Sequence, residues 1–147
     1  MFGMGCFWGA EKKFWTLGKD VITKVGYAGG QVADPNYKQV CNGQTGHAEV
    51  VHVSYDPEKL PLNELLTTFW TSHDPTTKDR QGYDVGTQYR SCIFVTTDQQ
   101  LEAVEKSIKT LNEKESFGKK SITTEVKKDV TFYMAEDYHQ KYLQKNH

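Results

Sequence analysis

Cys6 combines a nucleophilic side chain with a setting that could activate it, because it directly precedes the aromatic pair Phe7 and Trp8. Phenylalanine and tryptophan recur seven residues later, which predicts a helix over residues 7–17. Cys6 would then lie at the helix N-terminus, where unpaired N–H groups and the helix dipole favour an anion and lower a thiol pKa. A buried structural cysteine is the alternative interpretation.

A carboxylic acid is expected on the apolar face of a strand. Residues 47–56 alternate so that Glu49 extends a row of apolar side chains. Burial without a cation raises a carboxyl pKa, so Glu49 could act as a general acid near neutral pH. A solvated glutamate at an exposed strand end is the alternative.

Polar loops supply further candidates, namely Tyr37, Asp84 and Tyr89. His47 could deprotonate Cys6, as the base of a cysteine hydrolase does. Aromatic rings beside a thiol suit a methyl or a soft sulfur group. Tyrosine hydroxyls and a protonated acid suit an oxygen that needs hydrogen bonds and protons. Together these residue types describe a site for an S=O group beside a methyl.

The elements that must position these residues alternate along the chain. Strands are predicted at 1–5, 21–28, 47–56, 89–97, 122–126 and 130–134, and helices at 7–17, 60–72, 98–113 and 136–145. This order predicts an α/β or α+β fold with helices packed on a mixed sheet. Long coil segments at 31–47 and 76–88 could meet the cysteine turn at one rim of the sheet, where sites are often placed.

Composition narrows the functional class. A length of 147 residues suits one compact domain, and no internal boundary divides 1–147. The 18 basic and 19 acidic residues form no basic block, which disfavours a nucleic-acid partner, and no apolar run approaches the ~20 residues that span a membrane. Three widely spaced cysteines show neither a disulfide framework nor a zinc pattern. We therefore expect a cytoplasmic monomer without metal or cofactor.

Six motifs of the chain resemble the methionine sulfoxide reductase A family, which acts on the S epimer of methionine sulfoxide. They are GCFWG (5–9), GYAGG (26–30), NYKQVCNGQTGHAEVV (36–51), HDPTT (73–77), RQGYDVGTQYRS (80–91) and AEDYHQKYL (135–143). The resemblance covers nearly the whole chain in order. It implies a two-layer α/β sandwich with much coil, and an oxidoreductase that repairs oxidised methionine in peptides, in proteins and as the free amino acid.

The resemblance also implies a nucleophile and a pocket for the substrate. Cys6 matches the family's catalytic cysteine, and Phe7 and Trp8 match the pair that holds the substrate methyl. The Cys6 thiolate would attack the sulfoxide sulfur, methionine would leave, and Cys6 would become a sulfenic acid.

Four further matches concern the sulfoxide oxygen. Glu49 matches the acid that protonates it, Tyr37 and Tyr89 match the tyrosines that hydrogen-bond it, and Asp84 matches an acid lining the same site. Donation to this oxygen as it gains negative charge is an oxyanion-type stabilisation. His139 and Tyr142 are expected to pack the last helix near the site.

The route by which Cys6 is reduced again stays open at this point. Many family members carry resolving cysteines in a C-terminal tail, but no cysteine follows Cys92 in this sequence. Glutathione, glutaredoxin or thioredoxin could reduce Cys6 directly, Cys41 or Cys92 could resolve it, or a tail could lie outside this sequence. Cys92 is expected to be inert because it lies in an apolar strand.

Two other functions compete with the reductase. One is a cysteine hydrolase or acyl transferase that uses Cys6 and His47. The other is a non-catalytic binder of oxidised methionine.

Overall fold

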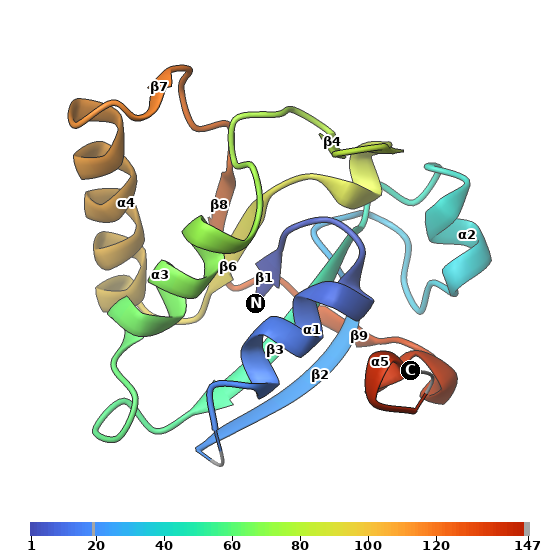
Figure 1. Ribbon diagram of the computed structural model, residues 1–147. Helices are drawn as coiled ribbons and strands as arrows, with labels where there is room; N and C mark the ends of the chain where they lie inside the picture. Colours follow the sequence, from blue (N-terminus) through green and yellow to red (C-terminus); the bar gives the residue numbers. More distant parts are fainter. Residues whose placement is uncertain (19, 146–147) are drawn as a thin grey trace.

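A six-stranded mixed sheet forms the centre of the computed structural model, which describes residues 1–18 and 20–145 (Figure 1). The strand order is β8-β6-β1-β3-β2-β9, and every neighbouring pair is antiparallel except β6 and β8. The strands are β1 (Phe2–Gly3), β2 (Val21–Ala28), β3 (Ala48–Tyr55), β6 (Cys92–Val95), β8 (Glu125–Lys128) and β9 (Phe132–Met134). The predicted mixed sheet is confirmed.

Helices and short turns connect these strands. The helices are α1 (Phe7–Trp15), α2 (Tyr37–Cys41), α3 (Leu62–Ser72), α4 (Asp98–Glu113) and α5 (Tyr142–Lys145). Two 3-10 turns, η1 (Thr87–Tyr89) and η2 (Asp137–His139), a hairpin of β4 (Arg80–Gln81) with β5 (Asp84–Val85), and β7 (Ser116–Lys119) complete the described elements. No helix in the described part of the chain is long and apolar enough to cross a membrane.

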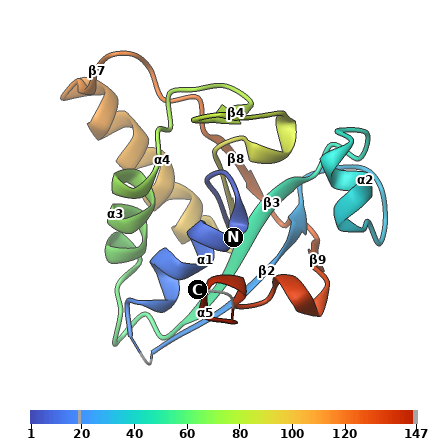
Figure 2. The same cartoon turned by 45° about the vertical axis from the view of Figure 1, so that its right-hand side comes forward.

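The two faces of the sheet are covered differently. Helices α1, α3 and α4 lie on one face, and Figure 2 shows α1 in front of β3 with α3 and α4 to its left. Phe14, Leu65 and Val104, one from each helix, are buried there against Val51 and the neighbouring strands. Strand residues of the opposite parity form a smaller second cluster, which includes Val50. This arrangement of helices on one face is the two-layer sandwich that the family resemblance implies.

Several predicted segments differ from the structure. The coil at 76–88 contains the β4–β5 hairpin and most of η1, and the strand predicted at 122–126 is found at Glu125–Lys128. The coil at 31–47 contains α2, which begins because Asn36 accepts a hydrogen bond from the Gln39 N–H at 2.9 Å while the Gln39 side chain accepts one from the Asn36 N–H at 3.0 Å. The predicted final helix over 136–145 is wrong as one element. Lys141 adopts a left-handed φ of 53°, which separates η2 from α5 and redirects the chain.

Candidate active site

The turn that carries Cys6 is shaped by the glycine before it. Gly5 has a φ of +97°, which brings the chain from β1 into α1, and Cys6 occupies the N-cap position of that helix. A Cβ at Gly5 would come within 3.0 Å of the Gln81 side chain. The β4–β5 hairpin therefore packs directly on the cysteine turn, and the same hairpin carries Asp84. The predicted helix-end position of Cys6 is confirmed.

The predicted lowering of the Cys6 pKa is wrong. The pKa of the Cys6 thiol is raised to about 11, chiefly by burial and to a smaller extent by the negative charges of Glu49 and Asp84. The backbone N–H groups of Trp8 and Gly9 at the start of α1 favour the thiolate, but they do not outweigh burial. At neutral pH the free protein therefore holds Cys6 as a thiol.

Glu49 lies beneath the start of α1. Glu49 is only 1% exposed, and its Oε1 accepts a hydrogen bond from the Phe7 N–H at 3.2 Å. Its Oε2 is buried and has no hydrogen-bond partner among the described residues. Burial raises the pKa of Glu49 to about 7, and the charge of Asp84 raises it while the Phe7 N–H lowers it. The predicted buried acid is confirmed, and the alternative of a solvated strand end is excluded.

Two phenol groups lie within the electrostatic reach of Glu49. Tyr37 begins α2 and Tyr89 ends η1, and both side chains are half-buried. Burial is the largest cause that raises both pKa values, and the charge of Glu49 contributes to both; the pKa of Tyr89 is raised to about 12. Charge on Cys6 also raises the pKa of Tyr89. Both hydroxyls are therefore protonated donors near the acid, and the fold brings Cys6, Glu49 and both tyrosines together.

Asp84 takes a different place in this cluster. It is exposed on β5, and its charge raises the pKa values of Cys6, Glu49 and Tyr89. The negative charge of this solvated carboxylate favours the protonated form of all three groups. The predicted proximity of Asp84 to the other site residues is thus supported by these effects.

Aromatic rings pack together around the two residues that follow Cys6. Phe7 is fully buried, with ring centroids 5.7 Å from Tyr27 and 6.3 Å from Tyr37. Trp8 is half-buried and stacks on Tyr142 with centroids 3.7 Å apart and an interplanar angle of 11°. The Trp8 Nε1–H donates to His139 Nδ1 at 2.9 Å. We call Phe7, Trp8, Tyr37, His139 and Tyr142 the aromatic cluster.

The C-terminal segment contributes site residues that the sequence analysis missed or treated as packing. Glu136 accepts hydrogen bonds from the Tyr27 hydroxyl at 2.9 Å and from the Tyr37 N–H at 3.1 Å. His139 is fully buried, 5.1 Å from the Phe7 ring and 4.4 Å from the Tyr37 ring. Their only signal in the sequence is the motif at 135–143, which does not show what it contacts.

His47 cannot serve as the base of a cysteine hydrolase in this arrangement. Its Nδ1 accepts a hydrogen bond from the Gly30 N–H at 2.9 Å, so its Nε2 carries the proton and donates to the Val32 carbonyl at 2.6 Å. Both ring nitrogens are occupied by backbone groups, and the residue is 2% exposed. His47 instead holds the glycine turn after β2 against the loop before β3.

The two other cysteines differ in their access to the site. Cys92 is fully buried in β6, burial raises its pKa to about 12, and a Cβ at Gly3 would come 2.3 Å from its Sγ. Cys41 is half-buried at the end of α2, where burial raises its pKa and a hydrogen bond from the Tyr37 side chain lowers it. Cys41 therefore adjoins the site, while Cys92 is enclosed in the sheet.

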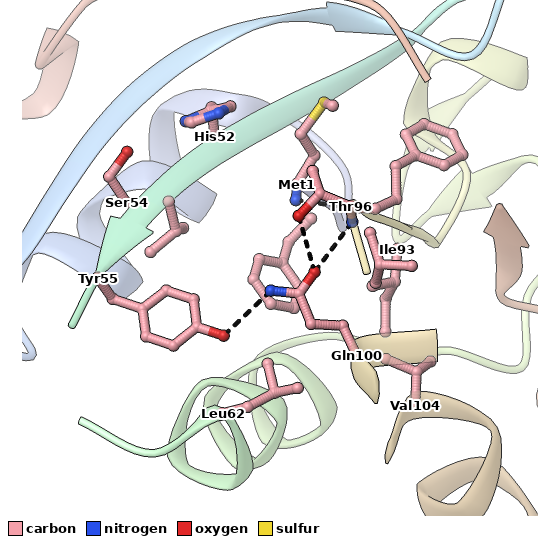
Figure 3. Close-up of a pocket in the computed structure, with 13 residues that line it drawn as sticks. Met1, His52, Ser54, Tyr55, Leu62, Ile93, Thr96, Gln100 and Val104 are labelled. Atoms are coloured by element: carbon pink, nitrogen blue, oxygen red, sulfur yellow. Dashed lines mark hydrogen bonds between the residues drawn. The ribbon is translucent and has the colours of Figure 1, made fainter. Parts of the chain in front are cut away.

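A separate cavity of about 310 Å³ lies between β3, β6, α3 and α4 (Figure 3). Gln100 crosses it, accepting from the Thr96 N–H at 2.9 Å and donating to the Tyr55 hydroxyl at 3.4 Å. None of its lining residues belongs to the predicted site. Among the residues that the structure describes, no group of three or more His, Cys, Asp or Glu side chains is arranged to hold a metal ion.

Known proteins resemble this chain in sequence and in structure. A family model described as peptide methionine sulfoxide reductase matches residues 1–147. The chain belongs to the peptide methionine sulfoxide reductase family. A relative named peptide methionine sulfoxide reductase MsrA, from Salinispora arenicola, is 53% identical over 97% of this chain and 66% of its own length. The human mitochondrial peptide methionine sulfoxide reductase is 55% identical over 99% of this chain and 63% of its own length.

Structural comparison agrees with this membership. Methionine sulfoxide reductase A of Corynebacterium diphtheriae superposes with a TM-score of 0.90 at 41% sequence identity, covering 99% of this chain and 73% of that protein. The fold and the family that the motifs predict are both confirmed. The chain spans slightly less than two thirds of the length of the Salinispora and human reductases.

Proposed function

We propose that this peptide methionine sulfoxide reductase family member reduces methionine-S-sulfoxide, in peptides and proteins and as the free amino acid, to methionine. The observation that carries this proposal is the placement of Glu49. Its buried carboxyl group accepts from the N–H of Phe7, the residue after Cys6, has a pKa of about 7, and has a second oxygen with no hydrogen-bond partner within residues 1–18 and 20–145. An acid of this kind can carry a proton to a sulfoxide oxygen beside the thiol.

The first step forms a bond between two sulfur atoms. The Cys6 thiol passes its proton to the Glu49 carboxylate, and the resulting thiolate attacks the electrophilic sulfur of the sulfoxide. Glu49 delivers a proton to the oxygen, and the resulting hydroxyl transfers to the Cys6 sulfur as both the new sulfur–sulfur bond and the sulfur–oxygen bond of the substrate break. The products are methionine and a Cys6 sulfenic acid, so that sulfoxide sulfur is reduced by two electrons and cysteine sulfur is oxidised by two.

The raised pKa values suit this sequence of proton transfers. The pKa of Cys6 is about 11 and that of Glu49 is about 7. Between these two pH values the two groups of the free site together hold one proton. That proton count permits the thiolate and protonated acid pair that the reaction uses. Tyr37 and Tyr89 donate to the oxygen as its negative charge grows, which stabilises the transition state.

The aromatic cluster supplies recognition of the methyl group. Phe7 and Trp8 follow the nucleophile on α1, so a methyl bonded to the reacting sulfur would meet their rings. An apolar, polarisable surface favours a thioether methyl over a hydrated polar substituent. Asp84 contributes negative charge at the open edge of the site.

A thiol from outside the chain completes the proposed cycle. Thioredoxin, glutaredoxin or glutathione would attack the Cys6 sulfenic acid and release water, and a second thiol would then restore Cys6. Residues 1–147 would act as one catalytic domain and as a monomer in the cytoplasm, where three unpaired cysteines remain reduced. This activity would repair oxidised proteins under oxidative stress.

Dithiothreitol-driven reduction of a methionine sulfoxide peptide tests the proposal. Wild-type protein should convert the S epimer and leave the R epimer, and Cys6→Ser should abolish turnover. Turnover that survives Cys6→Ser would refute the mechanism. Peptide binding without product in the wild type would favour the non-catalytic binder instead.

A further inference from the structure

The C-terminal segment over residues 136–142 attaches to the body of the protein through several consecutive side chains. Gln140 accepts from the Val25 N–H at 2.9 Å and donates to the Val25 carbonyl at 2.9 Å, so it continues the pairing of β2 beyond the end of β9. Residues on either side of it reach the aromatic cluster. The segment is therefore built into the surroundings of Cys6, and Figure 2 shows α5 beside α1.

An ion pair lies at the centre of this attachment. Glu11 is fully buried on α1, and its Oε1 accepts from the Lys141 N–H at 2.7 Å. Its Oε2 accepts from Lys141 Nζ at 2.8 Å and from the Thr23 hydroxyl at 2.9 Å. Lys141 Nζ also donates to the Thr23 carbonyl at 2.7 Å. Both carboxylate oxygens are satisfied, which is the condition under which a buried charge is tolerated.

Lys141 makes these contacts while its own backbone adopts an unfavourable conformation. Its φ of 53° is uncommon for a residue with a long side chain, and such strain persists where the surroundings fix it. Here the Lys141 N–H and its ammonium group are both held by one carboxylate. The conformation that breaks the C-terminal segment into η2 and α5 is thus tied to the contact with Glu11.

The ion pair shares its two elements with Trp8 and its contacts. Glu11 lies three residues after Trp8 on α1, so the two side chains occupy one face of the helix. Lys141 lies between His139 and Tyr142, the residues that hydrogen-bond and stack on the Trp8 indole. A contact that fixes Lys141 on Glu11 therefore fixes where the histidine and the tyrosine meet Trp8.

We propose that Glu11 and Lys141 are positioning residues, whose ion pair sets the orientation of the Trp8 indole for the substrate methyl. The effect on substrate rests on the proposed function, because that function assigns the methyl contact to Trp8. The effect on the indole does not rest on it. Trp8 would keep its place on α1 without the ion pair but lose its fixed hydrogen bond and stacking partner.

The test follows the indole N–H of Trp8 by NMR, with Trp70 as an internal reference. The Trp70 Nε1–H donates to Ser107 Oγ at 2.9 Å between α3 and α4, away from the C-terminal segment. In Lys141→Met the Trp8 indole should exchange with solvent about tenfold faster, as expected for a lost hydrogen bond. The Trp70 indole should stay as in the wild type, and Lys141→Arg should restore the Trp8 signal.

Kinetics with a methionine sulfoxide peptide give the second measurement. Lys141→Met should raise KM about fivefold or more while kcat changes little, because uniform binding is lost and the Cys6 and Glu49 pair is untouched. Lys145→Met, an exposed change at the end of α5, should leave both constants unchanged. If the wild type reduces no sulfoxide, the proposed function fails, while the indole measurement still tests the ion pair.

Two results would overturn the positioning role. One is a Trp8 indole that behaves as in the wild type when Lys141 is replaced. The other is faster exchange of the Trp8 and Trp70 indoles together, which would show a general loss of stability. If Lys141→Met does not fold, Thr23→Val removes one hydroxyl from the cluster and should change the Trp8 signal in the same direction by a smaller factor.

Discussion

The carboxyl group of Glu49 lies close enough to Cys6 for its negative charge to raise the pKa of the thiol. Ionisation of Glu49 therefore disfavours ionisation of Cys6, although the N–H groups at the helix N-terminus favour the thiolate. Burial, not the helix, dominates the ionisation of Cys6. Several consequences of this relationship can be measured without substrate.

Removing the charge of Glu49 should make the Cys6 thiol more acidic. Burial is the main cause that raises the pKa of Cys6 to about 11, and the charges of Glu49 and Asp84 add to it, so Glu49→Gln eliminates one of these two charges. Alkylation of Cys6 by iodoacetamide, followed by mass spectrometry across pH, should therefore show a midpoint at lower pH than in the wild type. Asp84→Asn should move the midpoint in the same direction by less. An unchanged or higher midpoint in Glu49→Gln would contradict the coupling.

The reductive step should speed up as the pH rises through about 7. The proposed reaction uses one proton shared by Cys6 and Glu49, and below the Glu49 pKa of about 7 both groups are protonated. Single-turnover rates at low substrate concentration should therefore rise across this range in the wild type. Glu49→Gln should lose this rise and should slow the reductive step more than it weakens substrate binding. Equal single-turnover rates in the two proteins would argue against proton transfer through Glu49.

The local pattern of the sequence predicted several features correctly. The bounds of β2, the position of Cys6 before α1 and the burial of Glu49 all follow from residue alternation and helix spacing, which depend on neighbours along the chain. The pKa direction of Cys6 could not be predicted in this way. Its burial depends on the β4–β5 hairpin and on β3, which are distant in sequence.

Two further features of the structure were not predicted from the sequence, for different reasons. The helix α2 has a readable signal, Asn36 followed three residues later by Gln39, but the surrounding segment lacks apolar periodicity. The contacts of Glu136 and His139 have no such signal. They form only when the segment near residue 140 packs on α1 and β2. Lys141 and Glu11, which join this segment to α1, are 130 residues apart in the sequence.

Each tyrosine at the oxygen should contribute to catalysis separately. Tyr37→Phe and Tyr89→Phe each remove one donor while they keep the ring, so kcat/KM for a methionine sulfoxide peptide should fall by about tenfold to 100-fold in each case. Tyr83→Phe is a matched control because Tyr83 is fully exposed on the hairpin. Activity that withstands both site substitutions would remove the tyrosines from the proposed mechanism.

We expect that the Cys6 sulfenic acid is reduced by a thiol from outside the chain, and that neither Cys41 nor Cys92 performs this step. Cys92 is enclosed in the sheet, and burial raises the pKa of the half-buried Cys41 thiol, which disfavours its thiolate. Mass spectrometry after one turnover without added thiol should therefore show a single oxidised sulfur on Cys6, which dimedone traps equally in the wild type and in Cys41→Ser. Loss of two hydrogens with a Cys6–Cys41 link would show internal resolution instead.

His73 should make the protein less stable in mild acid. Its Nδ1–H donates to the Phe69 carbonyl at 2.7 Å, and its Nε2 accepts from the Ser91 hydroxyl at 2.7 Å. Burial lowers the pKa of His73 from 6.5 to about 4. The unfolded chain therefore binds a proton that the folded protein excludes, and the contribution present above pH 6.5 is lost as the pH falls towards 4.

Urea unfolding at pH 7.5 and pH 5 measures this contribution. The free energy of unfolding should fall more between these values in the wild type than in His73→Asn, which keeps a donor for Phe69 but has no titrating ring. Ser91→Ala should cost about 1 to 3 kcal/mol at pH 7.5, because the His73 Nε2 and the Thr124 hydroxyl both lose a partner. A pH dependence that is identical in the wild type and His73→Asn would show that this histidine does not exclude a proton in the folded state.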